Sequence, residues 1–238
     1  MSEPILRLSA VTKEFGGLTA VDNVDFSVAE GELRCLIGPN GAGKSTIFRM
    51  VTGVYHPTRG RIFYKGSALG NTPSFKRARM GISIKFQTPM VYYDQPLMQN
   101  LIVALQRFHG PAEARIRADG IMEDFGIADA AGKPAIDVAH GYRQWLEIGM
   151  AVASSPKLLL LDEPTAGMSA EETAKTARLV HKLADGGMTV IVIDHDIEFV
   201  RMLNCNLTVL HLGRLFAEGT LDEIQADDGV RAIYLGKK

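Results

Sequence analysis

Hydrophobic and polar residues alternate near the start of the chain, over residues 5–28 (ILRLSAV, then VDNVDFSV), with a turn signal at Gly16-Gly17. A period of two is typical of strands with one buried face, so this pattern predicts antiparallel strands. Residues 33–38 (LRCLIG) form an almost continuous apolar run, and the following STIFRMVTGV has helical spacing. These stretches predict a buried strand that leads through a glycine-rich turn into a helix.

The rest of the chain alternates between strand-like and helix-like stretches. Residues 60–65 (GRIFYK) predict a strand, and helical stretches dominate from Phe75 to about Ser155. Two apolar runs follow, KLLLLDE and MTVIVIDHD, and the helical AEETAKTARLVHKLA separates them. This strand-helix-strand alternation predicts a parallel sheet. The tail NLTVLHLGRLFAEGTLDEI predicts a hairpin around Leu212-Gly213, followed by a short helix.

The composition is typical of a globular protein. The chain has 238 residues, of which 46% are hydrophobic and 22% charged, enough for one sizeable core with a smaller lobe. A formal net charge of -1 gives no electrostatic reason to expect nucleic acid as a partner. The two cysteines, Cys35 and Cys205, do not indicate a disulfide framework, because Cys35 lies in an apolar run. A reducing cytosol fits this composition.

The apolar segments do not predict export or a membrane span. The N-terminal MSEPILRLSAVTKEF lacks the basic-then-apolar design of a secretory signal. The longest apolar stretches, at 158–161 and 188–193, are far shorter than the ~20 residues that a membrane-spanning helix needs. If the protein acts at a membrane, we expect another chain to span it.

A glycine-rich turn between the predicted strand and helix matches the phosphate-binding pattern G-x-x-x-x-G-K-[ST]. Its glycines let backbone N–H groups surround phosphate oxygens, and the helix directs its positive end at them. Lys44 suits the β- and γ-phosphates, and the Ser45 hydroxyl suits Mg²⁺. The alternative is a chance glycine-rich turn. The residues expected to bind nucleotide here are Gly38, Pro39, Asn40, Gly41, Ala42, Gly43, Lys44, Ser45 and Thr46.

Two later apolar strands end in polar residues. Asp162 and Glu163 follow LLLL, at the edge where open α/β sheets place their ligands. Asp162 would hold the Mg²⁺ shell, and Glu163 would polarise the attacking water as a general base. An acidic pair alone is more often a helix start or a surface feature, and the phosphate turn reverses that preference. His195 ends the strand VIVID and would donate to the γ-phosphate or the water, although a histidine there is often structural.

The ordered set GPNGAGKST, KFQTP, AHGYRQ, LLLLDEP and IDHD resembles the ATPase subunits of ATP-binding-cassette (ABC) transporters, over nearly the whole chain. The resemblance implies an α/β P-loop NTPase fold with a parallel sheet, an N-terminal antiparallel β subdomain and an inserted helical subdomain. We place the nucleotide-binding core with its β subdomain at residues 1–87 and 156–238, and the helical subdomain at residues 88–155.

The resemblance also implies roles that the residues alone do not. Phe15 in KEFGG would stack on the adenine of ATP, Gln87 would contact Mg²⁺ and the attacking water, and His195 would be the switch histidine. Without the family, core packing is the favoured interpretation of Phe15, and a surface amide is the favoured interpretation of Gln87.

Further segments are similar to the ATPase subunits of branched-chain amino acid and urea importers: QWLEIGM, DEPTAGM and AEGTLDEIQADDGVRAIYLG. Those importers combine two different ATPase subunits with two permease subunits and an external solute-binding protein. The resemblance therefore implies a chain at the cytoplasmic face of the membrane, bound to transmembrane permease subunits and to a second ATPase subunit. Whether that second subunit is a copy of this chain stays open.

The permease is expected to dock near the glutamine loop. Residues Pro89 to Asn100 (PMVYYDQPLMQN) contain the side chains suited to it: Met90, Tyr92, Tyr93 and Met98. Ordinary packing within the helical subdomain is an equal alternative for each of these side chains.

The signature segment departs from the family pattern. Family members carry a sequence close to LSGGQ or LSHGQ, whereas this chain has Val138-Ala139-His140-Gly141-Tyr142. In the family this helix start caps the γ-phosphate bound to the opposite subunit. Ala139 lacks the serine hydroxyl, so about 1.5–3 kcal/mol is lost, while backbone amides, Gly141 and His140 remain as donors.

A second departure lies after the catalytic glutamate, where Ser169 replaces the usual aspartate. The absence of this aspartate affects communication between the subunits, while the altered signature affects the site that holds the partner's ATP. We therefore expect this chain's own Lys44 and Glu163 site to be competent and the opposing site to be slow.

Two other functions remain as alternatives. One is a soluble ABC ATPase that drives an assembly, repair or translation partner, but the chain has a single short cassette and an importer-like tail. The other is a nucleotide-binding module without catalysis, which the residues disfavour because Lys44, Asp162, Glu163 and His195 are all present.

Overall fold

The computed structural model describes residues 3–87 and 90–235. The alternating N-terminal stretch forms the expected antiparallel sheet, in the order β2-β1-β4-β5. Strand β1 (Leu6–Phe15) pairs with β2 (Leu18–Val28) across the turn at Gly16-Gly17, and with β4 (Arg59–Tyr64) on its other edge. The short β5 (Ser67–Ala68) completes this sheet.

The second sheet has six strands in the order β10-β9-β3-β8-β7-β6. The five strands from β9 to β6 are parallel, and β10 pairs antiparallel with β9. This arrangement confirms the predicted parallel sheet and the hairpin at Leu212-Gly213. The strands are β3 (Leu33–Ile37), β6 (Ile82–Lys85), β7 (Leu158–Asp162), β8 (Thr189–Ile193), β9 (Asn206–His211) and β10 (Arg214–Gly219).

Each central strand buries both of its faces, and the two faces belong to different hydrophobic cores. In β7, Leu158 and Leu160 join the core shared with the antiparallel sheet and α1 (Lys44–Val51). Leu159 and Leu161 join the other core, under the helices that cover the opposite face. Because successive side chains of a strand point to opposite faces, a continuous apolar run serves both cores.

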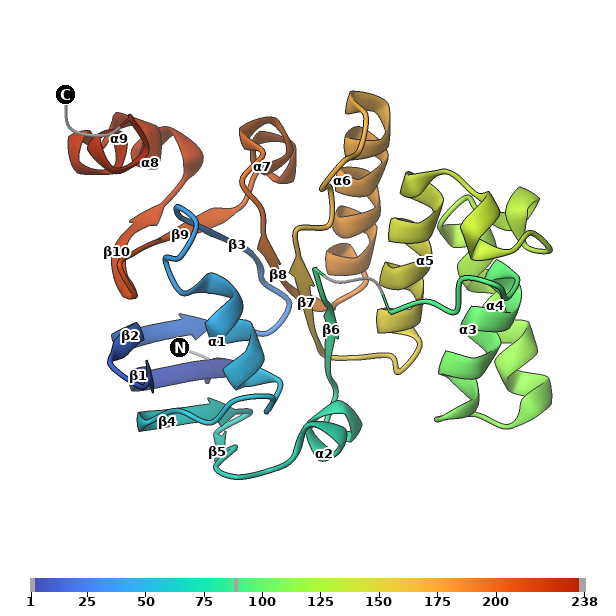
Figure 1. The fold of residues 1–238 in the computed structure, drawn as a ribbon, viewed down its shortest axis with the longest axis horizontal. Helices are drawn as coiled ribbons and strands as arrows, with labels where there is room; N and C mark the ends of the chain where they lie inside the picture. The colour runs from blue at the N-terminus through green and yellow to red at the C-terminus, as the bar shows by residue number, and fades with distance from the viewer. Residues whose placement is uncertain (1–2, 88–89, 236–238) are drawn as a thin grey trace.

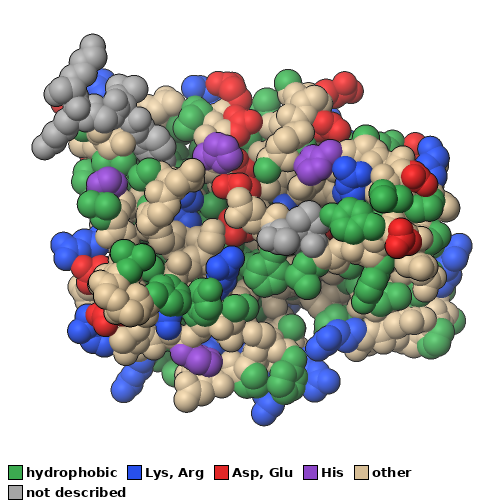
Figure 2. All heavy atoms as spheres, in the orientation of Figure 1, with side chains coloured by type: hydrophobic (Ala, Val, Ile, Leu, Met, Phe, Trp, Pro, Cys, Tyr) green, Lys and Arg blue, Asp and Glu red, His purple; other side chains and the backbone are tan. Residues whose placement is uncertain are grey.

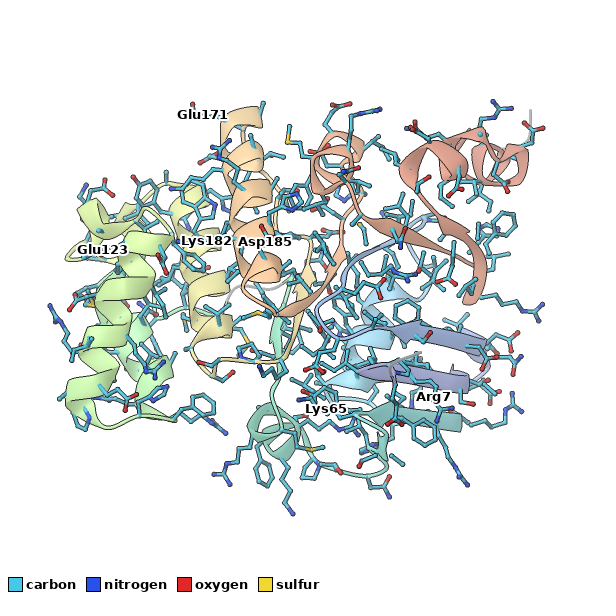
Figure 3. The ribbon with its side chains drawn as sticks, turned by 180° about the vertical axis from the view of Figure 1, so that it is seen from behind. Arg7, Lys65, Glu123, Glu171, Lys182 and Asp185 are labelled. Carbon is cyan, nitrogen blue, oxygen red and sulfur yellow. The ribbon has the colours of Figure 1, made fainter. Side chains whose placement is uncertain are left out.

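The helices lie mainly beyond the other face of the central sheet, away from the antiparallel sheet (Figure 1). Lys182 lies on the back of the molecule (Figure 3). Its Nζ pairs with Asp124 Oδ1 at 2.7 Å, which joins the helices Ala170–Asp185 and Pro111–Asp124. The helices besides α1 are α2 (Ser74–Arg79), α3 (Leu97–Gln106), α4 (Pro111–Asp124), α5 (His140–Val152), α6 (Ala170–Asp185), α7 (Ile197–Leu203), α8 (Leu221–Ala226) and α9 (Asp228–Leu235), with short 3-10 turns at Ala128–Ala130 and Ala135–Asp137.

Two details differ from the expectation. Strand β6 lies inside the stretch expected to be helical from Phe75. It was not predicted because four residues are too few to reveal a period, and its pairing with β7, as at Ile82 and Leu158, determines the strand. The tail carries two helices, α8 and α9, where one was expected. The boundaries of the helical subdomain at residues 88–155 stay a prediction. Within the described residues, every helix is too short or too polar to cross a bilayer.

Candidate active site

The glycine-rich turn connects β3 to α1, as predicted, and two of its glycines are required by the space around them. Gly38 has a φ of 148°, and a Cβ there would lie 2.2 Å from the Leu210 carbonyl oxygen. Gly43 has a φ of 102°, and its Cβ would lie 2.5 Å from the Ala20 carbonyl oxygen. Neither position admits a side chain, because both distances are far below van der Waals contact. The loop is therefore pressed against its neighbours while its N–H groups remain at the start of α1.

Lys44 lies inside this loop. Its ammonium donates to the carbonyl oxygens of Gly38 at 2.7 Å and Pro39 at 3.0 Å, and its side chain is buried. Burial lowers the pKa of Lys44, while the nearby carboxylates of Glu163 and Asp162 raise it. A cation held here among backbone N–H groups suits a polyphosphate.

Two of the three residues expected at the metal site, Ser45 and Asp162, meet behind the loop, while the third, Gln87, contacts Glu163. The Ser45 hydroxyl donates to Asp162 Oδ1 at 3.4 Å, and the Asp162 carboxyl is buried at the end of β7. Burial raises the pKa of Asp162, and the bond from Ser45 lowers it. Among the described residues no cluster of three or more His, Cys, Asp or Glu side chains could hold a metal. A hydroxyl and one carboxylate fit Mg²⁺, which takes few protein ligands and relies on phosphate oxygens and water.

Glu163 meets the two side chains that the sequence analysis associated with it. The Gln87 Nε2 donates to Glu163 Oε2 at 2.9 Å, and the His195 Nδ1 lies 3.6 Å from Glu163 Oε1. Glu163 has a φ of 49°, in the left-handed region, and its N–H donates to the Ile193 carbonyl at 2.8 Å. Such a conformation is uncommon for a residue other than glycine and occurs often at functional sites.

These residues line one cleft of about 810 Å³, together with the phosphate loop and Phe15. Phe15 is exposed at its rim, so the alternative of core packing is wrong for this side chain. Its ring meets Tyr55 edge to face at 5.1 Å between centroids, and the Lys13 Nζ lies 4.9 Å from its centre. An exposed aromatic ring at the mouth of a phosphate-binding cleft offers a stacking surface for a base.

The signature residues lie apart from this cleft, at the start of α5. Ala139 is the N-cap and offers no side-chain hydrogen bond. The His140 Nε2 lies 2.8 Å from the Ala166 carbonyl oxygen, within the segment that follows Glu163, so this nitrogen already has a partner. The sequence predicted His140 as a remaining donor to phosphate. This contact involves only its Nε2, so that role stays a prediction, beside those of Gly141 and the backbone N–H groups.

Ser169 and the exposed segment have defined surroundings. Ser169 caps α6 in a reciprocal capping box with Glu172.

In the segment expected to dock the permease, Met90 is exposed over 68% of its surface, Tyr92 and Tyr93 are also exposed, and Met98 packs partly against the core. Pro89 lies outside the described residues. Figure 2 shows hydrophobic side chains gathered on this face, over the region between β6 and α3.

Two buried residues behind the cleft, Asp194 and Lys85, were not predicted from the sequence. Asp194 accepts hydrogen bonds from the His195 N–H at 2.7 Å and from the Thr165 hydroxyl at 2.6 Å, so it fixes the segment that carries His195. Lys85 lies at the end of β6, and its ammonium reaches the Asp162 and Glu163 carbonyl oxygens at 3.4 and 3.3 Å. Burial lowers the pKa of Lys85. The only feature of the sequence that could have indicated these two residues is their position next to predicted site residues. Asp194 precedes His195, and Lys85 comes just before Phe86-Gln87.

Comparison with known proteins agrees with the geometry. The sequence matches the family described as ABC transporter over residues 21–166. It is 34% identical over 254 aligned residues to the high-affinity branched-chain amino acid transport ATP-binding protein BraF of Pseudomonas aeruginosa, and the alignment covers 100% of both chains.

Solved structures of ATP-binding cassettes share the fold at lower sequence identity. A nucleotide-free ATP-binding cassette from an ABC transporter has a TM-score of 0.89 and 28% identity, with 99% of this chain and 100% of that chain covered. The dimeric, post-hydrolysis cassette MJ0796 bound to ADP and Pi has a TM-score of 0.82 and 25% identity, with 91% and 98% covered. This chain therefore belongs to the ABC transporter family, as an ATP-binding and ATP-hydrolysing cassette of the α/β P-loop NTPase fold.

Proposed function

We propose that this chain powers an ABC importer of branched-chain amino acids, urea or related small polar solutes. The observation that carries the proposal is the cleft in which Gln87 and His195 approach the Glu163 carboxylate beside the phosphate loop. The similarity to BraF, a branched-chain amino acid transport protein, supports the solute class. Lys44 and the loop bind the phosphates of ATP, and Phe15 stacks on the adenine.

The chemistry depends on five side chains around the γ-phosphate. Ser45, Asp162 and Gln87 would hold Mg²⁺, and the bound ion would neutralise charge on the phosphates. Glu163 accepts the proton of the attacking water, and His195 donates a hydrogen bond to the γ-phosphate or to that water. The left-handed backbone at Glu163 and the donor from Gln87 direct the carboxylate toward the reacting side of the cleft.

A second ATPase subunit completes each site. The start of α5, with Ala139, His140 and Gly141, faces ATP held by that subunit, and the partner's signature faces ATP held by Lys44. Because Ala139 has no hydroxyl, the site holding the partner's ATP turns over slowly, while this chain's own site is competent. Inactivating the catalytic glutamate of each subunit in turn measures this difference, and equal residual rates would contradict it.

Permease subunits bind the exposed segment of the helical subdomain at the cytoplasmic face of the membrane. Met90, Tyr92 and Tyr93 expose apolar surface there without a partner among the described residues of this chain. A solute-binding protein delivers solute to the permease from the other side.

The decisive experiment measures phosphate release with MgATP for the wild type and for Glu163→Gln. The substitution keeps size and hydrogen bonding but removes the base, so turnover falls by about 10²- to 10⁴-fold while nucleotide binding remains. Glu123→Gln is the matched control, because Glu123 is an exposed carboxylate on α4 outside the cleft (Figure 3). Unchanged turnover in Glu163→Gln would refute the assignment of the base.

Uptake into membrane vesicles tests the transport role. Vesicles that contain the complex with its permease subunits should accumulate labelled leucine or urea only with ATP and an intact Glu163. ATP turnover without association with any membrane partner would instead support the alternative of a soluble ABC ATPase in assembly or repair.

A further inference from the structure

A buried ion pair lies directly behind the cleft and joins β6 to α5. The Lys85 Nζ lies 3.8 Å from Glu147 Oε2, and the two side chains are only 1% and 6% exposed. Two charges removed from water carry a large desolvation cost, and well-packed hydrophobic residues often serve stability as well or better. Stability alone therefore does not explain this pair.

Lys85 also holds the backbone of the acidic residues at the end of β7. Its ammonium donates to the carbonyl oxygens of Asp162 at 3.4 Å and Glu163 at 3.3 Å. On the other side, the Glu163 N–H donates to the Ile193 carbonyl at 2.8 Å. Both peptide groups of Glu163 are thus hydrogen-bonded while its φ stays at 49°. A left-handed conformation of a side-chain-bearing residue persists only where surrounding contacts enforce it.

Glu147 fixes the position of this lysine from the opposite element. It lies on α5, the helix that begins with the signature residues, and its other oxygen, Oε1, has no hydrogen-bond partner among the described residues. Its burial is therefore compensated mainly through the charge of Lys85. Two residues after Lys85 in the chain, Gln87 donates to the Glu163 carboxylate, so the same short segment holds Glu163 at both its backbone and its side chain.

We propose that Lys85 is a positioning residue for ATP hydrolysis, held by Glu147, which keeps the Glu163 backbone in the conformation that presents its carboxylate. The proposal rests on the role of Glu163 as the base. Without the Lys85 ammonium, the Glu163 carbonyl keeps only the longer contact from the Ala166 N–H, at 3.5 Å, and the backbone relaxes from the left-handed region, which moves the carboxylate. ATP binding depends on Lys44 and the phosphate loop and stays intact.

The test compares Lys85→Met, Glu147→Gln and the double variant in the complete transporter complex, with kcat, the KM for ATP and thermal unfolding as readouts. Each single variant leaves one buried charge without its ion-pair partner, so its unfolding temperature falls. The double variant removes both charges, so its stability recovers. Its kcat nevertheless stays about 100-fold below the wild type, the effect of a displaced catalytic group, with KM unchanged. Lys85→Arg keeps the cation and restores most of the rate.

Two controls make the result decisive. Ser83→Ala removes another hydrogen bond between β6 and α5, from the Ser83 hydroxyl to the Ala151 carbonyl at 2.6 Å, without contact to Glu163, and it keeps the wild-type kcat. Glu163→Gln is measured in parallel. Wild-type turnover in Glu163→Gln would overturn the assigned base itself. An inactive Glu163→Gln together with wild-type turnover in the stable double variant would overturn the role of Lys85 alone.

Discussion

The phosphate loop and the first turn of α5 both present backbone N–H groups at the start of a helix, and they differ in what surrounds those groups. In the loop, Lys44 adds a buried cation, and the Asp162 carboxylate lies behind it beside Ser45. At α5, the N-cap Ala139 adds no polar group, and the His140 Nε2 is already bonded to the Ala166 carbonyl.

This difference separates two ways of binding an anion. A helix start by itself contributes about 0.3–1 kcal/mol toward a nearby negative charge, and a cation with several N–H groups adds much more. The loop therefore holds a polyphosphate with groups of this chain alone. In the proposed complex, the start of α5 would add only a weak contact to a phosphate that the second subunit holds. Substitutions on the two sides should differ accordingly in size.

The largest effect is expected on the loop side, for Lys44→Ala. Removing the only side-chain cation that lines the cleft in the described part of the chain should lower turnover by about 10²- to 10³-fold. Phosphate release and binding of a fluorescent ATP analogue measure the loss. Lys182→Ala is the control, since Lys182 lies on α6 (Figure 3), pairs with Asp124 and does not line the cleft. An effect of similar size in both variants would contradict the special place of Lys44.

The loop side is also where the sequence was most informative. The spacing from Gly38 to Ser45 defines a backbone shape, and the apolar run before Asp162 defines a strand end, so both are local properties of the chain. The meeting of Gln87 with Glu163 was expected only from the family, because a glutamine after a strand has no local signature.

Contacts between segments that lie far apart in the chain could not be predicted from the sequence. Lys85 and Glu147 each look like an ordinary polar residue in a strand or a helix, and only the packing of β6 against α5 brings them together. Strand β6 itself was not predicted, because its identity depends on pairing with β7. The family resemblance likewise predicted that Ala139 lacks a hydroxyl. The contact between the His140 Nε2 and the Ala166 carbonyl could not be predicted, because it depends on how the segment after Glu163 folds.

The signature side allows a gain of function. Ala139→Ser restores a hydroxyl at the start of α5, and one hydrogen bond to a charged phosphate corresponds to about a tenfold faster turnover of the partner's ATP. Serine at an N-cap also stabilises the helix, so Ala139→Asp is the matched control, because it caps equally well but carries a negative charge. Phosphate release from a complex whose own Glu163 is inactivated isolates the relevant site. A rate increase in both variants would mean that helix stability, not phosphate contact, is responsible.

The Glu172 carboxylate also lies against the first turn of α5. A Cβ added to Gly141 would lie 2.3 Å from Glu172 Oε1, so this oxygen is in close contact with the turn. Glu172 Oε2 accepts from the Ser169 N–H at 2.8 Å and from its hydroxyl at 2.9 Å. The Ser169 N–H lowers the pKa of Glu172, and the Gly141 N–H lowers it further. The group is therefore ionised at neutral pH, and its charge opposes a phosphate at the same helix start.

Glu172→Gln should produce the smallest of the three effects. Glutamine preserves the capping box with Ser169, because its amide oxygen accepts the same bond, while the negative charge beside Gly141 is removed. One charge at an exposed helix start changes the affinity for an anion by about two- to fivefold. Turnover of the partner's ATP should therefore rise by that factor at low salt, and the gain should shrink as salt screens the charge.

Glu171→Gln, one residue earlier and outside the capping box, serves as the control. A slower rate in Glu172→Gln with an intact α6 would mean that the Glu172 carboxylate supports the first turn of α5 instead of competing with phosphate. The difference between the phosphate loop and the start of α5 would then depend on Ala139 alone.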